Sequence, residues 1–481
     1  MVLIIGGGIA GLATAYELHR RGLRFRIIEH RPRAGGVVLS EEVDGFVLDA
    51  GPDSLLVQKP DGIRLCEELG LGDRLVSTKP PRFAYIQRGG RLYRLPAASV
   101  LGIPTQWGPF IRTGLFTWAG KLRMAAEMFV PAKTDDADES IGSFMRRRFG
   151  HEATDFLAEP LLAGIHAGDV DRLSIRALFP RFVETERTHG SLLRAFRRAG
   201  SAHGRPDAPG PSRAGGAPPR APGNAAGGGD GAFRSLPGGL SELIRALVAA
   251  LPADAIQLNT RATSLSYGAG RYSVATNTGE VFEAPSVVLA TPAFASAAII
   301  RGLNGQLADL CAAIPYASAA TVAMAFDRAS VRHPLNGSGF VVPRVEGTGI
   351  LAGSWLSSKW PNRAPEGRVL MRTFLGGARD PLAFELSDAE MIARSLQALT
   401  PLVGITAPPL FTRVYRWERA NAQHEVGHLE RMAAIERALL AHPGLHLTGS
   451  AYRGVGIPDC VADARRTGRA IGDAENPEPR T

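Results

Sequence analysis

The sequence predicts an α/β protein, and three observations support that prediction. An apolar run over residues 2–5 leads into a glycine turn, Gly6–Gly11, and then into a helical pattern. A second apolar run, residues 25–28, ends at Glu29. Much later, residues 286–291 form another short apolar run, typical of a strand buried in a parallel sheet. Strands that alternate with helices in this way form a parallel sheet covered by helices.

The glycine turn has the G-x-G-x-x-G spacing that is typical of a site for the ADP part of a dinucleotide. Gly6 allows the tight turn, Gly8 lets the backbone approach a pyrophosphate, and Gly11 lets the helix pack closely on the strand. The first turn of that helix presents N–H groups to the phosphates. Glu29 lies near the spacing expected of a ribose-binding acid, which disfavours a 2′-phosphorylated cofactor.

A second small-residue turn follows at once. Arg33 can pair a pyrophosphate, and Gly35 and Gly36 leave room for a ring system beside it. Near the other end, residues 445–464 read as an apolar strand, a glycine turn and the start of a helix. The N–H groups of that helix start are placed to stabilise negative charge on a reduced flavin.

Composition sets the outer limits. With 481 residues, 45% of them hydrophobic and 21% charged, the chain can bury a large core divided into two or three domains. We find no signal-peptide pattern and no apolar stretch long enough to span a bilayer, so we expect a cytoplasmic protein. The three cysteines, Cys66, Cys311 and Cys460, are far apart and read as buried free thiols.

The remaining elements follow in order. Residues 200–231 are about half Gly and Pro, which predicts a disordered loop within one architecture. Periodicity predicts helices over residues 240–251, 386–399 and 430–441, and strands over 272–276, 320–327, 339–343 and 369–375.

One stretch is strongly basic. From Arg74 to Ala126 the chain has nine Lys and Arg residues and no acid, and bulky apolar residues alternate with them. That pattern favours a protein surface that binds a membrane of anionic lipid. The alternative is a solvated basic face over a core helix. Nucleic acid is disfavoured, because no nucleic-acid motif accompanies the charge.

Residues 424–428, His-Glu-Val-Gly-His, match the two-histidine pattern of zinc peptidases. We predict no metal there, because Gly427 weakens the helix that would align both imidazoles and no third ligand follows at a suitable spacing.

Taken together, several motifs resemble one enzyme family nearly end to end. They are Gly6–Gly11, Arg33–Gly36, Gly51–Ser54, Gln423–His428 and Tyr452–Cys460. The chain resembles the FAD-dependent porphyrinogen oxidases, meaning protoporphyrinogen oxidase and the coproporphyrin-forming coproporphyrinogen III oxidase, within the flavin amine oxidase superfamily. The first two motifs are common to the superfamily. The C-terminal run, with Ala163–Gly168 and Leu173–Arg176, is more particular to the porphyrinogen oxidases.

The resemblance implies FAD and a set of residues for it. The ADP half and ribityl chain would lie on Gly6, Gly7, Gly8, Ile9, Ala10, Gly11, Glu29, His30, Arg33, Gly35, Gly36 and Val37. The rest of the cofactor would lie on Gly51, Pro52, Asp53, Ser54, Ala262, Ser450, Val455, Gly456 and Ile457.

The same resemblance implies a substrate pocket. Arg82 would pair a substrate propionate, and Leu162, Gly164 and Ile165 would form a wall beside the macrocycle. Some relatives have Arg within the Gly51–Ser54 turn where this chain has Asp53, so the second carboxylate partner is open, with Lys59, Arg88 and Arg94 as candidates. No residue is implied as a nucleophile or general base.

The implied architecture is a Rossmann-like FAD-binding domain (residues 1–85, 233–300 and 410–475), a mixed-sheet substrate domain (86–110 and 301–409), a helical, membrane-facing subdomain (111–199) and a loop (200–232). The implied reaction is the oxygen-dependent, six-electron oxidation of protoporphyrinogen IX or coproporphyrinogen III, with hydride transfer to FAD and reduction of O2 to H2O2. Another amine-oxidase-type enzyme or a polyene desaturase is the alternative.

The implied partners are the porphyrinogen, O2, an anionic membrane on its inner face and a ferrochelatase. Oligomeric state is left open.

Overall fold

The computed structural model describes residues 1–95, 99–100, 103–104, 107–196 and 231–475. The chain forms two compact units, residues 1–76, 233–317 and 417–481, and residues 77–232 and 318–416. The sequence suggested boundaries at residues 85, 300 and 410. Most of the predicted loop, residues 200–230, lies outside the described residues.

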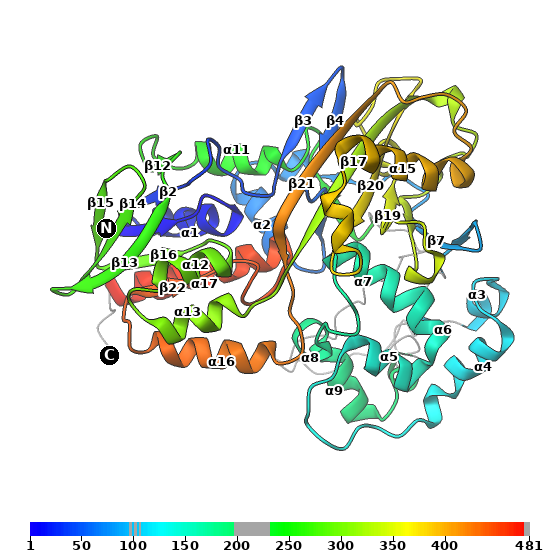
Figure 1. Cartoon of the computed structure of the whole chain (residues 1–481), viewed down its shortest axis with the longest axis horizontal. Coiled ribbons are helices and arrows are strands. Elements are labelled where there is room, and N and C mark those ends of the chain that lie inside the picture. Colours follow the sequence, from blue (N-terminus) through cyan, green and yellow to red (C-terminus); the bar gives the residue numbers. More distant parts are fainter. Residues whose placement is uncertain (96–98, 101–102, 105–106, 197–230, 476–481) are drawn as a thin grey trace, which may run out of the picture. The chain divides into compact units, whose positions relative to one another are not determined.

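A five-stranded parallel sheet forms the centre of the first unit (Figure 1). Its order is β12 (Ile256–Gln257), β2 (Phe25–Ile28), β1 (Val2–Ile5), β16 (Ser286–Leu289) and β22 (Leu445–Leu447). Side chains alternate along β1, because Val2 and Ile4 join one apolar core and Leu3 and Ile5 the other. The parallel strand predicted near residue 286 is therefore confirmed.

Helices and small sheets complete this unit. One core includes residues of α1 (Ile9–Arg20), α2 (Asp61–Glu68), α11 (Ser241–Ala249) and α17 (Ile457–Glu475). The other includes α12 (Ala293–Ile300), α13 (Gly305–Ala312), α16 (His428–Leu439) and an antiparallel sheet of β13 (Ala262–Gly268), β14 (Arg271–Thr276) and β15 (Val281–Ala284). The remaining elements are the hairpin β3 (Ser40–Val43) and β4 (Phe46–Asp49), η1 (Gly72–Arg74), and a sheet of β5 (Leu55–Leu56), β11 (Phe233–Ser235) and β6 (Val76–Ser77). The predicted buried free thiols are confirmed at all three cysteines.

A seven-stranded mixed sheet dominates the second unit, and the boundary between the units falls within two of its strands. Its order is β21 (Phe411–Ala422), β17 (Tyr316–Asp327), β20 (Arg368–Gly376), β19 (Ala352–Ser354), β18 (Gly339–Val341), β7 (Tyr85–Arg88) and β8 (Arg91–Arg94). The three strands predicted between residues 320 and 375 are confirmed. α15 (Asp388–Val403) starts at a capping box of Ser387 and Glu390 and packs on this sheet. This part of the second unit also contains short elements outside the seven-stranded sheet: β9 (Ser99–Val100), β10 (Ile103–Pro104), η4 (Arg328–Ser330), η5 (Arg344–Glu346), α14 (Leu356–Lys359) and η6 (Pro381–Glu385).

The same unit contains a helical segment, residues 107–189. It runs through α3 (Trp107–Arg112), α4 (Trp118–Ala125), η2 (Ala126–Phe129), α5 (Ile141–Phe149), α6 (His151–Ala153), the π-helical η3 (Thr154–Ala158), α7 (Glu159–His166), α8 (Ile175–Leu178) and α9 (Pro180–His189). Its aromatic and aliphatic side chains share one apolar core with Ile86 of β7.

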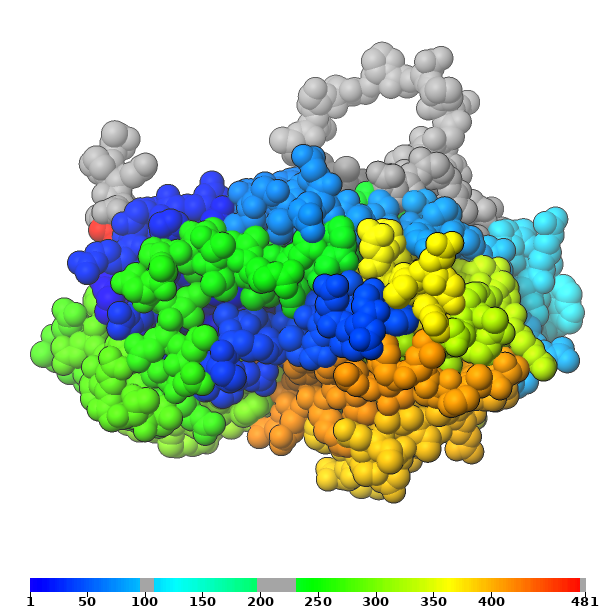
Figure 2. Space-filling model, turned by 90° about the horizontal axis from the view of Figure 1, so that it is seen from above, coloured from blue at the N-terminus to red at the C-terminus, as the bar shows by residue number. Residues whose placement is uncertain are grey.

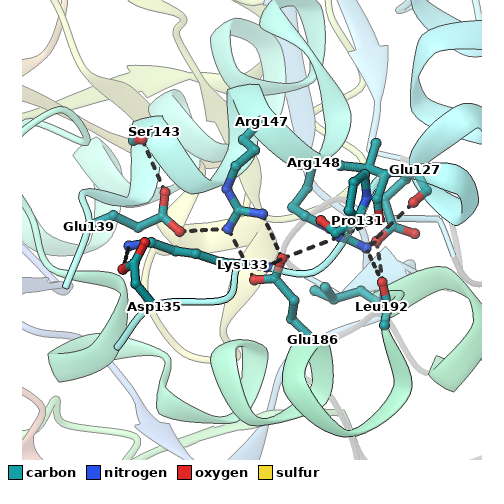
Figure 3. A network of polar contacts seen from close by, with 12 residues as sticks. Glu127, Pro131, Lys133, Asp135, Glu139, Ser143, Arg147, Arg148, Glu186 and Leu192 are labelled. Carbon is teal, nitrogen blue, oxygen red and sulfur yellow. Dashed lines mark hydrogen bonds and ion pairs between the residues drawn. The ribbon is translucent and has the colours of Figure 1, made fainter. Parts of the chain in front are cut away.

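Beside that apolar core lies a buried network of charged groups (Figure 3). Arg148 and Glu127 form an ion pair with both side chains fully buried, and Arg148 also lies 3.3 Å from Glu186. Arg147 bridges Glu186 and Glu139, at 2.6 Å from each. Burial alone would raise the pKa of Glu186, but the hydrogen bonds from Arg147 hold that pKa below its usual value.

Candidate functional site

The glycine turn after β1 is shaped by two steric requirements. Gly6 has φ +108°, a conformation that side chains disfavour. A Cβ at Gly11 would lie 1.9 Å from the Gly6 carbonyl oxygen, so only glycine allows α1 to start this close to β1. The tight turn predicted at Gly6 and the close packing of helix on strand predicted at Gly11 are both present.

The second glycine turn lies against the first. Gly35 donates its N–H to the Gly7 carbonyl at 2.8 Å, and a Cβ at Gly36 would lie 3.3 Å from the Gly8 Cα. The Arg33 guanidinium holds this turn, because it donates to the Gly36 carbonyl at 2.7 Å and to the Val38 carbonyl at 3.3 Å. Burial, together with the nearby Arg31 charge, lowers the pKa of Arg33. The two turns form a paired glycine cradle, residues 6–11 and 35–36.

The paired glycine cradle fits a pyrophosphate. A Cβ at Gly8 would meet no atom within 4 Å, so the backbone faces open space there. Gly8 is the N-cap of α1, and no side chain caps that helix. The first-turn N–H groups of Ile9 and Ala10 are thus positioned for an anion.

Glu29 fixes the cradle from the end of β2. Glu29 is 4% exposed, and its carboxylate accepts hydrogen bonds from the N–H of Gly7 at 2.6 Å and of Arg31 at 2.9 Å. His30 Nδ1 lies 2.9 Å from the same carboxylate. Two carboxylate oxygens offer about four acceptor sites, so with these three partners Glu29 has about one site left for a ribose hydroxyl. Ala262 starts β13 nearby, two residues after Thr260, whose N–H donates to the Glu29 carbonyl at 2.9 Å.

The Gly51–Ser54 turn lies against Val37. A Cβ at Gly51 would lie 2.2 Å from the Val37 carbonyl oxygen, and Ser235 donates to the Asp53 carbonyl at 2.8 Å. Trp417 donates its indole N–H to the Ala50 carbonyl at 2.9 Å and so supports the turn. Trp417 was not foreseen, since no local pattern places it some 370 residues along the chain beside this turn.

The loop between β22 and α17, residues 448–456, is held from several sides. Thr448 donates to Asp463 of α17 at 2.8 Å, and Gly449 and Gly454 have φ +120° and +145°. A Cβ at Gly454 would lie 2.6 Å from the Asp459 Cβ. Ser450, Val455 and Gly456 belong to this loop, and Ile457 opens α17. We call residues 448–456 the C-terminal loop.

The predicted substrate residues lie in the second unit and are only partly brought together. Gly164 of α7 approaches β18, because a Cβ there would lie 3.4 Å from Val341, and the neighbouring Ile165 is 62% exposed. Leu162, in contrast, is buried in the helical core. Arg82 donates Nε to the Thr78 carbonyl at 2.9 Å, which orients its guanidinium.

The three candidates for a second carboxylate partner, Lys59, Arg88 and Arg94, each have different contacts in the structure. Lys59 pairs with Asp459 at 2.6 Å. Arg88 pairs with Glu152 at 2.7 Å and lies over the Phe156 ring. Arg94 lies over the Phe83 ring, with its Cζ 3.7 Å from the ring centroid.

Comparison with known proteins agrees with this geometry. Residues 9–472 match the family of flavin-containing amine oxidoreductases. Coproporphyrinogen III oxidase of Bacillus subtilis is 35% identical over 98% of this chain and 97% of its own length. The enzyme of that name from Propionibacterium freudenreichii is 33% identical over 98% of this chain and 91% of its own.

Among solved structures, a provisionally named protoporphyrinogen oxidase from Exiguobacterium sp. 255-15 superposes with a TM-score of 0.83, at 33% identity and 98% coverage of both chains. The family uses FAD, and the paired glycine cradle fits that cofactor. The chain belongs to the flavin-containing amine oxidoreductase family and, within it, to the FAD-dependent porphyrinogen oxidases.

Proposed function

We propose that this protein oxidises coproporphyrinogen III to coproporphyrin III, with dioxygen as the terminal acceptor. The observation that carries the proposal is the end-to-end similarity to coproporphyrinogen III oxidases, at 35% and 33% identity over 98% of the chain. Protoporphyrinogen IX, the second candidate, is favoured by the name of the Exiguobacterium relative, a protoporphyrinogen oxidase.

The reaction removes six electrons and six protons from the macrocycle, which three O2 molecules take up to give three H2O2. Bound FAD supplies the two-electron acceptor for each step. The residues of this chain bind and orient. We assign the pyrophosphate to Gly8 and the first turn of α1, the ribose to Glu29 and the flavin ring to the C-terminal loop.

On the substrate side, Arg82 pairs one propionate, and Gly164 with Ile165 forms an apolar wall. Leu162 supports that wall from the helical core behind it. Aromatisation drives the chemistry, so positioning is the main task of the protein.

The test is porphyrin fluorescence in air, with equal flavin-normalised protein and each porphyrinogen in turn, against a control without protein. We expect acceleration with both substrates and a higher kcat/KM for coproporphyrinogen III. Equal or reversed preference would contradict the substrate assignment. No acceleration with either substrate, despite bound FAD, would overturn the porphyrinogen assignment and favour an amine or polyene oxidase.

We also propose contact with an anionic membrane surface, through an apolar patch formed by Ile111, Trp118, Leu122 and Phe129. These side chains are 48, 66, 70 and 80% exposed, and Figure 2 shows this cyan segment at the surface. Fewer cations face outward than the sequence suggested. Lys121 is buried and donates to the Ile111 carbonyl, and Arg123 donates to carbonyls at the end of α5. The insertion of apolar side chains would therefore contribute more to the free energy of membrane binding than the attraction between charges.

Sedimentation with vesicles that contain phosphatidylglycerol tests this contact. We expect the wild type to pellet and Trp118→Ser/Leu122→Ser to stay in solution, while Leu440→Ser, which changes an even more exposed leucine of the other unit, still pellets. Equal pelleting of all three proteins would contradict the patch. Among the helices of the described residues, none is long and apolar enough to cross a bilayer. Contact with a ferrochelatase stays a prediction.

A further inference from the structure

The two histidines of the zinc-like motif are arranged as a stacked pair. His424 follows β21 and His428 opens α16, and the turn between them has Gly427 at φ +88°. Their ring centroids are 3.9 Å apart with planes inclined by only 10°, and the residues are 3% and 1% exposed. Because the rings are buried and in contact, two positive charges there would repel each other, so at most one ring is charged.

Each ring has one nitrogen hydrogen-bonded to the C-terminal loop. His424 Nε2 lies 3.1 Å from the Ser450 carbonyl oxygen, and His428 Nε2 lies 3.0 Å from the Tyr452 carbonyl oxygen. A carbonyl oxygen can only accept, so both Nε2 atoms carry hydrogen. The Nε2 atom of each ring is therefore engaged with the backbone of the C-terminal loop.

The two carbonyls are alternate residues of one short loop. Neighbouring groups anchor its ends, since Thr448 donates to Asp463 and Gly456 N–H donates to Asp459 at 3.3 Å. Between those anchors, the histidines fix the direction of two peptide planes. Tyr452 itself is 2% exposed, so a rotated peptide here would leave a carbonyl buried without a partner.

We propose that His424 and His428 are positioning residues that clamp the C-terminal loop in the conformation that receives the flavin ring. The inference rests on the assignment of that loop to FAD. It gives a role to a sequence pattern that otherwise suggests a metal site.

The neutral state of His428 belongs to this arrangement. Its Nδ1 is buried and has no hydrogen-bond partner among the described residues. Burial lowers the pKa of His428, with Arg431 lowering it further, while the Tyr452 carbonyl and Glu430 oppose that effect. A proton on Nδ1 would place an unpaired charge against the ring of His424.

The experiment compares holoproteins of the wild type, His428→Leu, His428→Gln and His446→Leu. Leucine removes the donor, glutamine can place an N–H near Nε2, and His446 is a half-buried histidine of β22 in the same unit, whose removal serves as the control. The readout is the rate of FAD release after dilution, followed by the rise in flavin fluorescence, together with the flavin absorption spectrum and the unfolding temperature of each protein after FAD removal.

We expect His428→Leu to release FAD about tenfold faster and to shift the flavin spectrum, as the loss of one buried hydrogen bond predicts. His428→Gln should restore most of the retention, and His446→Leu should retain FAD like the wild type. His424→Leu and His424→Gln should repeat the pattern, which keeps the test valid if one leucine variant does not fold.

Equal release from His428→Leu and His446→Leu, or a glutamine variant no better than leucine, would overturn the clamp. Failure of the proposed function can be distinguished from failure of the clamp. If the variants show this pattern of FAD release but the wild type oxidises neither porphyrinogen, the result supports the clamp and contradicts the substrate assignment.

Discussion

The paired glycine cradle and the buried charge network of the helical segment are held together by opposite means. In the cradle, Gly6, Gly11 and Gly35 let backbone approach backbone, and the one buried acid, Glu29, accepts backbone N–H groups. In the helical segment, Arg148 and Glu127 are both fully buried and paired with each other. The cradle depends on residues that have no side chain, and the network depends on long charged side chains. Substitution by alanine therefore adds a group in the cradle and removes charged groups in the network.

The largest effect should come from breaking the network. Arg148→Ala leaves the Glu127 carboxylate buried without its main counter-charge, which costs about 3–5 kcal/mol. Arg146 lies on the same helix as Arg148, and Arg146→Ala, which removes a partly exposed pair with Asp171, should cost at most about 1 kcal/mol. Chemical denaturation followed by circular dichroism measures both. Similar losses for the two variants would show that the buried pair has no special weight.

The cradle should lose its cofactor before its fold. Gly8→Ala adds a methyl group that meets no protein atom, so the unfolding temperature of the protein without FAD should stay unchanged while FAD retention falls about tenfold or more. Gly11→Ala should lower both the unfolding temperature and FAD retention, because its Cβ would overlap the Gly6 carbonyl. Bound flavin is quantified by absorbance after gel filtration. A Gly8→Ala protein with full flavin content would contradict the pyrophosphate assignment.

Replacing Arg82 should affect substrate binding and leave FAD binding unchanged. Arg82→Ala should leave FAD content unchanged and raise the KM for the porphyrinogen about tenfold, the effect of losing one charge-assisted hydrogen bond. Arg91→Ala, an exposed arginine of β8, is the matched control. Steady-state kinetics in air measure both, and an unchanged KM in Arg82→Ala would refute the propionate contact.

The smallest effect concerns pH. Burial lowers the folded-state pKa of His428, whereas its unfolded value is about 6.5. As pH falls below about 6.5, the unfolded chain binds a proton that the folded chain does not, so stability decreases until the folded pKa is reached. The unfolding temperature of the wild type should therefore drop more between about pH 7 and pH 5 than that of His428→Gln. Parallel curves for the two proteins would contradict a neutral His428.

The contrast between the two regions also explains what could be predicted from the sequence. The cradle was predictable because its glycines have a fixed spacing and each meets a steric requirement within a few residues. The charge network was not, since Glu127 meets Arg148 across two helices and a basic run does not say which of its cations turn inward. Lys121 and Arg88 were expected on a basic face, and both are engaged inside the protein.

Long-range packing limited the rest of the site. Leu162, which the resemblance implies for the macrocycle wall, is buried in the helical core, and its role in that wall stays a prediction. Trp417 supports the Gly51–Ser54 turn, and the stacked histidines contact the C-terminal loop. These partners are separated along the sequence, so no local pattern predicts such contacts.

The most direct test of the account is a single turnover without oxygen. The yellow holoprotein is mixed anaerobically with coproporphyrinogen III, and the visible flavin absorbance is followed in time. We predict bleaching at least as fast as kcat, with the colour restored and H2O2 formed when air is admitted. Flavin that stays oxidised while porphyrin appears only at the rate of the protein-free control would contradict the account.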